Sequence, residues 1–176
     1  KHSFTVDKQE NIARIVKEAF HIATSGRQGP VVIDVPKDLT NPDDLFDFNY
    51  PSKANIRSYN PPTKPENHQV ARAVDAILAA ERPVIYAGGG TIASNASDEL
   101  RELNELIDFP VTNTLMGLGV YPGTGKRFLG MLGMHGTYQA NMAMHNADLI
   151  IAVGARFDDR ITNTPVSYTH LRAHET

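Results

Sequence analysis

"PVIYAGGGTIA", residues 83–93, has the pattern of a strand that ends in a glycine turn and leads directly into a helix. Residues 83–87 are apolar in succession, which favours a parallel strand covered on both faces. The glycines at 88–90 satisfy the spacing G-x-G-x-x-A, in which backbone N–H groups can approach a diphosphate. A tight structural turn explains these glycines equally well. A nicotinamide site would also require an acidic residue at the end of the next strand, where "PVTNT" has none.

Helices and strands alternate on either side of this stretch. Apolar spacing predicts a helix from about 65 to 78, a second around 97–107 and a third from about 138 to 146. Strands are expected at 110–114 and from 148, with a loop over 115–136. This alternation predicts an α/β fold with a doubly wound parallel sheet.

The first 64 residues form a separate pattern. We expect a helix over 7–24, with Asp7 and Glu10 as a capping box, and then a strand over 30–35. One helix and one strand cannot bury a core of their own, so residues 1–40 are interpreted as the end of a second, truncated α/β domain. Residues 41–64 are rich in proline and aromatic side chains and are predicted to be an ordered interdomain linker.

Composition excludes several classes of function. The 176 residues carry a net charge of -3 without a basic block, which argues against nucleic acid or an acidic membrane as partner. There is no cysteine, so thiolate metal sites and cysteine nucleophiles are excluded. No apolar stretch approaches the roughly 20 residues that span a bilayer. The chain starts with Lys1 rather than Met, so a targeting signal would lie upstream.

The loop at 115–136 is a candidate binding loop. It holds seven of the thirteen glycines and three of the five methionines, and loops of this length are commonly functional. Glycines allow close backbone approach, and methionines make adaptable contacts to a flat ring. His135 has no cluster of ligands around it, so a ring contact or an ordinary loop histidine is favoured over a metal ligand.

The charges in "IIAVGARFDDR", residues 150–160, follow an apolar run at the end of a predicted strand. Arg156 and Arg160 can each bind a phosphate or carboxylate in a bidentate fork, and the aspartates can orient them or accept ribose hydroxyls. A solvated salt-bridge cluster is the alternative. We favour a site for an anionic ligand, because ligands of parallel sheets bind at the carboxyl ends of the strands. Residues 163–176 follow no pattern and are interpreted as a foreign or read-through tail, or else a surface tail.

Four segments together are similar to a known family: "GRQGPVVIDVPKDLT", "TLMGLG", "MLGMHG" and "ADLIIAVGARFDDRIT". They resemble the large catalytic subunit of the acetohydroxyacid synthase (acetolactate synthase) family, which depends on thiamine diphosphate. The resemblance runs from Lys1 to about Thr162. Gln28 departs from it, because the family usually has proline there.

The resemblance implies a division into domains and a site. Residues 1–40 correspond to the end of the pyrimidine-binding domain and residues 65–162 to an incomplete central domain that binds FAD. It implies FAD contacts at Arg27, Gly88, Gly89, Gly90, Thr114, Leu115, Met134, His135, Gly154, Ala155, Arg156, Asp158 and Arg160. Arg160, Met134 and Lys37 would also face the substrate.

The resemblance implies a reaction in which pyruvate is decarboxylated on thiamine diphosphate and joined to a second 2-keto acid, for branched-chain amino-acid synthesis. The motifs for thiamine diphosphate and Mg²⁺ and the catalytic residues would lie outside this chain, which is expected to be an inactive fragment without a metal site. A homo-oligomer with a separate regulatory subunit is expected, in the cytoplasm or an organelle. Two alternatives stay open: a redox relative such as pyruvate oxidase, and a stand-alone nucleotide-binding module.

Overall fold

The computed structural model describes residues 1–158, 160 and 161. The chain divides into two compact units, residues 1–63 and residues from 64 onward, and each is described by itself. Asp159, one of the charged residues considered for the site, lies outside the described residues, and so does the tail at 163–176.

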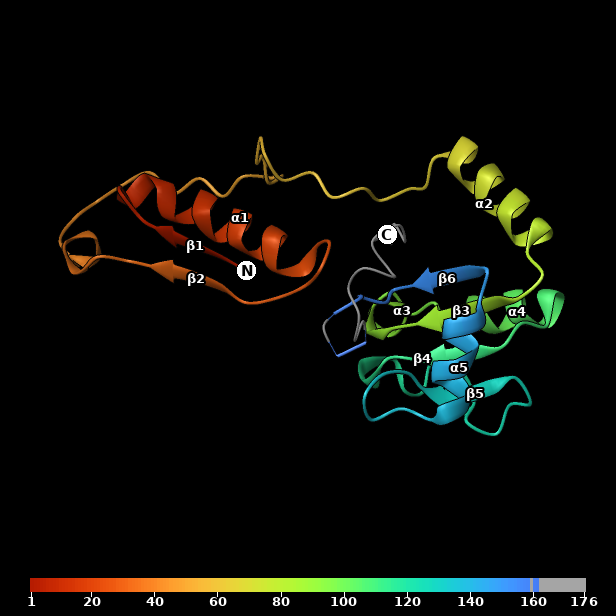
Figure 1. Cartoon of the computed structure of the whole chain (residues 1–176). Helices are drawn as coiled ribbons and strands as arrows, with labels where there is room; N and C mark the ends of the chain where they lie inside the picture. Colours follow the sequence, from red (N-terminus) through yellow and green to blue (C-terminus); the bar gives the residue numbers. More distant parts are fainter. Residues whose placement is uncertain (159, 162–176) are drawn as a thin grey trace. The chain divides into compact units, whose positions relative to one another are not determined.

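The first unit is a β-α-β arrangement (Figure 1). Strand β1 (His2–Thr5) pairs in parallel with β2 (Val31–Asp34), and α1 (Ile12–Thr24) connects them. Apolar residues at helical spacing on α1, among them Ile15, Ala19 and Ile22, are buried. The helix therefore covers its two-stranded sheet with one apolar stripe, as the periodicity predicted.

Two details of this unit differ from the prediction. Strand β1 was not expected, because four residues at the start of the chain carry too short a pattern to identify. The predicted capping box is wrong as well: a 3-10 turn, η1 (Gln9–Asn11), precedes α1, and Asp7 instead accepts a hydrogen bond from Asn11 Nδ2 at 2.7 Å.

The segment after β2 begins with a 3-10 turn, η2 (Lys37–Thr40), and then runs without regular structure to α2. Two of its tyrosines contact α1 and its end. Tyr59 donates a hydrogen bond to the carbonyl of Ser25 at 2.7 Å, and the ammonium of Lys17 lies 5.0 Å from the centre of the Tyr50 ring. Aromatic side chains therefore hold parts of this segment against α1 and the residue that follows it.

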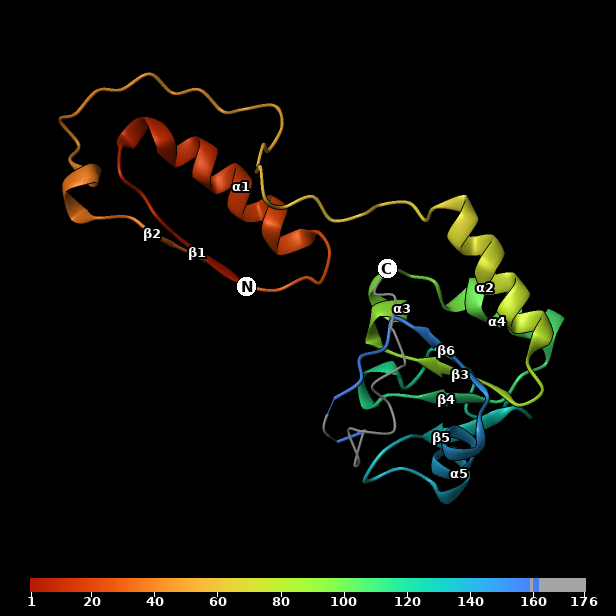
Figure 2. The same ribbon diagram turned by 45° about the horizontal axis from the view of Figure 1, so that its top comes forward.

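The second unit contains a parallel sheet of four strands in the order β5-β4-β3-β6 (Figure 2). Its strands are β3 (Pro83–Ala87), β4 (Val111–Asn113), β5 (Phe128–Met131) and β6 (Leu149–Val153). Its helices are α2 (Asn67–Ala79), α3 (Gly89–Ala93), α4 (Ser97–Ile107) and α5 (Tyr138–Asn146), with a 3-10 turn, η3 (Leu115–Gly117). The predicted α/β fold with a parallel sheet is confirmed.

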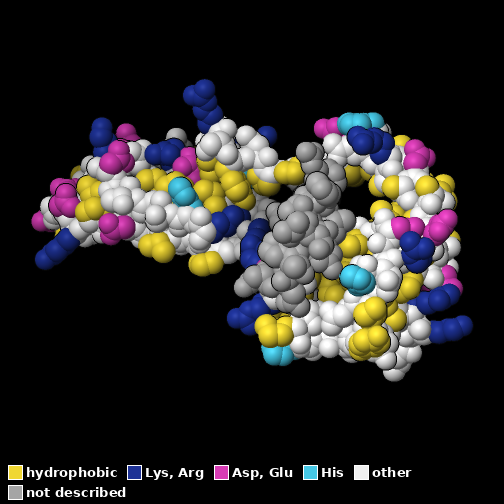
Figure 3. All heavy atoms as spheres, in the orientation of Figure 1, with side chains coloured by type: hydrophobic (Ala, Val, Ile, Leu, Met, Phe, Trp, Pro, Cys, Tyr) yellow, Lys and Arg dark blue, Asp and Glu magenta, His cyan; other side chains and the backbone are white. Residues whose placement is uncertain are grey.

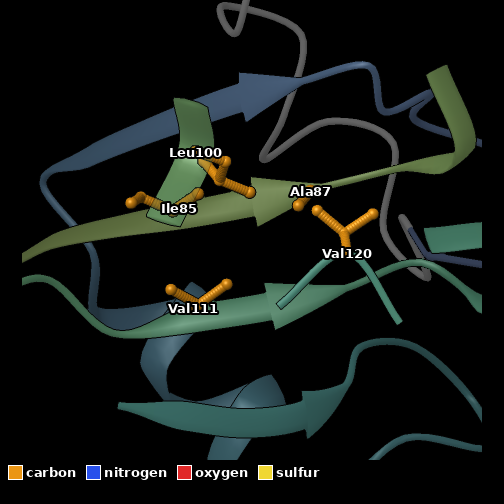
Figure 4. Packing of buried hydrophobic residues seen from close by; sticks show 5 residues of the cluster. All are labelled: Ile85, Ala87, Leu100, Val111 and Val120. Atoms are coloured by element: carbon orange, nitrogen blue, oxygen red, sulfur yellow. The ribbon is translucent and has the colours of Figure 1, made fainter. Parts of the chain in front are cut away.

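The central strand β3 is buried on both faces, and its residues alternate between two clusters. Ile85 and Ala87 pack with Leu100 of α4 and with Val111 and Val120, and Figure 4 shows these side chains converging. On the other face, Tyr86 packs in a cluster with Leu132, Met144 of α5 and Ala155. The uninterrupted apolar run of β3 is the sequence counterpart of this burial on two sides.

Strand β5 lies inside the segment that the sequence analysis treated as a single loop, so that prediction is wrong there. Of the β5 residues, "FLGM", only Phe128 is of a type enriched in strands, and Gly130 lies at φ +92°, so the strand signal is weak. Pairing with β4 organises them instead: Val111 lies opposite Phe128, and Asn113 lies opposite Met131.

Helix α2 has an apolar face that the described residues leave open. Val70, Val74 and Leu78 follow helical spacing, and all three are exposed, as the hydrophobic side chains on α2 in Figure 3 show. None of the residues of this helix is buried. Within the part of the chain that is described, no helix is both long enough and apolar enough to cross a membrane.

Candidate functional site

Three connections meet at the carboxyl edge of the second unit's sheet. They follow β3, β4 and β6, which are neighbours in the sheet and run in the same direction. The first contains the glycines at 88–90, the second Thr114 and η3, and the third Gly154 to Ile161. The prediction that these segments face one edge of the sheet is therefore confirmed.

The connections after β3 and β6 pack backbone against backbone. The N–H of Gly88 donates to the carbonyl of Val153 at 2.9 Å, and the N–H of Gly90 donates to the carbonyl of Gly154 at 2.9 Å. A Cβ atom on Gly88 would lie 2.2 Å from the carbonyl oxygen of Gly154. Gly154 has φ +58°, the left-handed region that favours glycine. Glycine is required here because no side chain fits between the two turns.

This packing changes how the glycine motif is interpreted. The N–H groups of Gly88 and Gly90 already donate to carbonyl groups of the β6 turn, so these two donors are used within the fold. A tight turn packed against the β6 connection, which was the alternative explanation of the motif, accounts for Gly88 and Gly90. Gly89 is only partly buried, and a Cβ atom on it would lie 3.0 Å from Cβ of Met116.

The turn after β4 packs against the carboxyl end of β3. The N–H of Thr114 donates to the carbonyl of Ala87 at 2.9 Å, and a Cβ atom on Gly117 would lie 2.5 Å from that same carbonyl oxygen. Leu115 and Met116, at the start of this turn, are 68% and 76% exposed. The turn thus presents two flexible apolar side chains at the edge where the three strands end.

Two buried polar atoms lie in the same segment. Asn113 is fully buried, and its Nδ2 donates to the carbonyl of Gly117 at 2.9 Å. Asn113 Oδ1 and Thr114 Oγ1 are both buried and have no hydrogen-bond partner among the described residues. Buried polar atoms of this kind are commonly satisfied by a ligand or an ordered water molecule.

Arg156 extends from the β6 connection and is 57% exposed. Its Nη2 lies 3.2 Å from Oδ2 of Asp158, so the two form an ion pair. The hydroxyl of Tyr86 donates weakly to the carbonyl of Arg156 at 3.5 Å, and its ring lies 5.3 Å from the Phe157 ring. Burial, and secondly the carboxylate of Asp158, raises the pKa of Tyr86 well above its usual value, so this hydroxyl stays protonated.

The segment around Arg160 is joined to the loop that contains Met134. The N–H of Met134 donates to the carbonyl of Arg160 at 3.2 Å, and the N–H of Arg160 donates to Oδ1 of Asp158 at 3.1 Å. Met134, His135 and the side chain of Arg160 are exposed at this edge. Two of the residues that the resemblance assigned to the substrate, Met134 and Arg160, are therefore neighbours.

The remaining predicted residues differ in their settings. Ala155 is buried in the cluster around Tyr86. Arg27 and Lys37 are exposed residues of the first unit, and Arg27 follows Gly26 at φ +55°. The assignments of Arg27, Lys37 and Ala155, like all the other FAD and substrate assignments, stay predictions.

One cavity of the second unit lies at the opposite edge of the sheet. A pocket of about 590 Å³ lies at the amino ends of β3 and β4, and its wall includes Arg82, Phe109 and Met142. Its charged groups serve the fold: Asp108 is paired with Arg127, and Arg82 Nε donates to the carbonyl of Asn146 at 3.0 Å. Since parallel sheets bind ligands beyond the carboxyl ends of their strands, we assign the site to the opposite edge.

The described residues contain no group of three or more histidine, cysteine, aspartate or glutamate side chains that could hold a metal ion. His135 accordingly has no ligand cluster in this part of the chain. Sequence reasoning missed the roles of Asn113 and Tyr86, because a single asparagine or tyrosine in a strand carries no motif. It also missed Thr91, whose Oγ1 donates to the carbonyl of Val153 at 2.9 Å.

Comparison with known proteins agrees with this geometry. Residues 70–174 match the family model described as thiamine pyrophosphate enzyme, central domain. A solved structure from Mycobacterium smegmatis, described as a thiamin diphosphate-dependent enzyme, has a TM-score of 0.68 and 24% identity. The matched region covers 89% of this chain and 29% of the Mycobacterium smegmatis chain. At 24% identity this similarity shows the fold alone.

The relatives found by sequence are more similar. The acetolactate synthase large subunit of Buchnera aphidicola subsp. Acyrthosiphon pisum is 55% identical over 168 residues. The acetolactate synthase isozyme 3 large subunit of Escherichia coli is 51% identical over 168 residues. Both alignments cover 96% of this chain and 29% of the relative, so the chain spans less than a third of their length. The resemblance drawn from the four sequence segments is confirmed, and because the family model covers more than half of the chain, the chain belongs to the thiamine pyrophosphate enzymes.

Proposed function

We propose that this chain is part of the catalytic large subunit of an acetolactate synthase and that its second unit holds the FAD of that enzyme. The observation that carries the proposal is the 55% identity to an acetolactate synthase large subunit over nearly the whole chain. The site supports it independently, because it combines groups suited to each part of a flavin nucleotide at one edge of a parallel sheet.

The carboxyl edge offers groups that fit FAD. Leu115, Met116 and Met134 are exposed apolar side chains that suit contact with the flat ring system. The exposed guanidinium of Arg156 suits the diphosphate, and Asp158 holds it at 3.2 Å. The Oγ1 of Thr114, which has no hydrogen-bond partner among the described residues, suits a hydroxyl or N–H group of the bound molecule.

In the proposed reaction, pyruvate is decarboxylated and the remaining two-carbon unit is joined to pyruvate or 2-ketobutyrate. Thiamine diphosphate, when bound with Mg²⁺, supplies the carbanion chemistry that this decarboxylation requires. The residues that hold it would belong to parts of the enzyme outside this chain. FAD would contribute no net oxidation or reduction.

Arg160 is proposed to bind the second substrate. Its guanidinium can bind the carboxylate of a 2-keto acid in a bidentate fork. The bond between its carbonyl and the N–H of Met134 places an apolar side chain next to it, suited to the substrate's methyl or ethyl group. Lys37 and Arg27, on the first unit, are proposed to contribute to the substrate and FAD sites respectively. The name "large subunit" of the relatives also supports a separate small subunit, which we propose as a regulatory partner of a homo-oligomeric enzyme.

The proposal is tested on the full-length subunit that contains this sequence. We expect Arg156→Ala to weaken FAD binding about 10- to 150-fold, since a hydrogen bond to a charged group contributes about 1.5–3 kcal/mol. Arg101→Ala is the matched control, because Arg101 is also an exposed arginine paired with an aspartate, on α4. FAD affinity measured by quenching of flavin fluorescence should change less than twofold in this control.

Product analysis tests the reaction itself. The wild-type subunit, supplied with pyruvate, thiamine diphosphate, Mg²⁺ and FAD, should form acetolactate. Under anaerobic conditions its flavin should stay oxidised through many turnovers. Stoichiometric bleaching of the flavin by pyruvate without acetolactate would assign the chain to the oxidase relatives instead.

A further inference from the structure

Asn113 is the last residue of β4 and lies at the centre of the carboxyl edge. It is fully buried, opposite Ala87 of β3 on one side and Met131 of β5 on the other. A fully buried asparagine at a strand end destabilises the fold unless its amide forms hydrogen bonds, because a buried polar group without a partner has lost its hydrogen bonds to water. The hydrogen bonds of the Asn113 amide therefore decide whether this residue stabilises the segment.

The NH₂ group of the Asn113 amide has a hydrogen-bond partner. Nδ2 donates to the carbonyl of Gly117 at 2.9 Å, across the turn formed by Leu115–Gly117. Gly117 itself lies so close to β3 that an added Cβ would be 2.5 Å from the carbonyl oxygen of Ala87 and 2.9 Å from Cα of Gly88. Asn113 thus holds the third residue of the turn down onto the end of β3.

The position of that turn decides where its first two side chains point. Leu115 and Met116 leave the turn between its anchored ends, since Thr114 donates to Ala87 and Gly117 is held by Asn113. A Cβ on Gly89 would lie 3.0 Å from Cβ of Met116, so the turn also packs against the start of α3. The Gly117 carbonyl also accepts a hydrogen bond from the N–H of Val120 at 3.1 Å, so loss of the Asn113 bond would loosen the turn that carries both exposed side chains without releasing it fully.

In the part of the chain that the structure describes, the other end of the Asn113 amide and the hydroxyl of Thr114 form no hydrogen bond. Oδ1 of Asn113 and Oγ1 of Thr114 are buried without a partner among the described residues. The site therefore keeps hydrogen-bonding capacity on consecutive residues of the segment that carries the turn.

We infer that Asn113 is a positioning residue for the bound flavin, which it serves by fixing the Leu115–Gly117 turn through the Gly117 carbonyl. This inference rests on the proposed function. Asn113 acts through Gly117 on Leu115 and Met116, which make the contact with the ring. Its loss weakens flavin binding more than the accompanying loss of stability explains.

The test compares Asn113→Leu with Thr112→Val in the full-length subunit. Thr112 is the matched control because it is the preceding residue of β4 and equally buried, and its Oγ1 donates at 2.9 Å to the carbonyl of Gly130 in β5 rather than to the turn. Both variants should lower the melting temperature. Only Asn113→Leu should weaken FAD binding, by about 10- to 100-fold, and shift the visible flavin spectrum.

Asn113→Asp provides a second variant that keeps the shape of the side chain. A protonated carboxyl can donate to the Gly117 carbonyl, whereas an ionised one repels it, so its FAD affinity should recover relative to wild type as the pH falls. This pH profile also decides the question if Asn113→Leu does not fold.

Equal FAD affinities for Asn113→Leu and Thr112→Val, or a pH profile of Asn113→Asp parallel to wild type, would reduce Asn113 to a structural residue while leaving the proposed function intact. A wild-type subunit that binds no FAD would overturn both proposals together.

Discussion

Gly90 and Gly154 are in direct backbone contact: the N–H of Gly90 donates to the carbonyl of Gly154 at 2.9 Å, and a Cβ on Gly154 would lie 2.8 Å from the Cα of Gly90. The contact joins the turns after β3 and β6, and no side chain fits between their backbones at this point.

Gly154→Ala should destabilise the second unit by at least about 2 kcal/mol. The added Cβ would lie 2.3 Å from the backbone nitrogen of Thr91, and alanine is strained at φ +58°. Gly123→Ala is the control, since a Cβ there meets nothing within 4 Å and Gly123 is not among the glycines with positive φ. Urea unfolding followed by circular dichroism measures both, and equal midpoints would show that the two turns can separate at little cost.

Ile85→Ala should cost about 2–5 kcal/mol, because the side chain is fully buried between β4 and α4 and its loss leaves a cavity. Leu106→Ala removes a similar side chain that is 80% exposed, so its effect should stay within about 0.5 kcal/mol. The melting temperatures of the two variants, compared with wild type, measure this difference in stability. A small effect at Ile85 would mean that the cluster shown in Figure 4 is not the core of this unit.

Asp148 makes stability depend on pH. The N–H groups of Glu81 and Arg82 each donate to its carboxylate at 2.8 Å, and these bonds hold its pKa below the ordinary value of 3.8. A depressed pKa adds stability above pH 3.8 that is lost as the pH falls through the lower folded value.

Asp148→Asn should therefore be less stable than wild type near pH 6, and the difference should shrink below about pH 4. Asp75→Asn, at an exposed position of α2, is the control. Melting temperatures measured from pH 3 to pH 6 test the expectation. A constant difference across that range would show that the ionised carboxylate has no special role.

Arg160→Lys in the full-length subunit should lower carboligation about 10- to 150-fold, because lysine keeps the charge but loses the bidentate fork. Choice between pyruvate and 2-ketobutyrate as second substrate should change more than the first decarboxylation does. Product ratios under competition measure this. Wild-type rates and ratios would leave Arg160 with a purely structural role, such as its backbone bond to Met134.

The sequence by itself determined the class of fold and the edge of the sheet where the site lies. Apolar runs at 83–87 and 149–153 and helical spacing over 97–107 are local patterns, set by burial on two faces or one. The four segments also identified the family, because glycines, arginines and aspartates at fixed spacing carry information that does not depend on packing.

Only the tertiary structure decided how these residues are used. Strand β5 forms because β4 offers backbone groups with which it can pair, and the residues "FLGM" carry only a weak strand preference of their own. The glycines at 88 and 90 resemble a phosphate-binding turn in sequence, yet their N–H groups bond to carbonyls more than sixty residues away. Asn113 likewise gains its role from the Gly117 carbonyl and from its full burial. Hydrogen bonds between distant segments depend on where the chain places each partner, and a local pattern contains only one of the two.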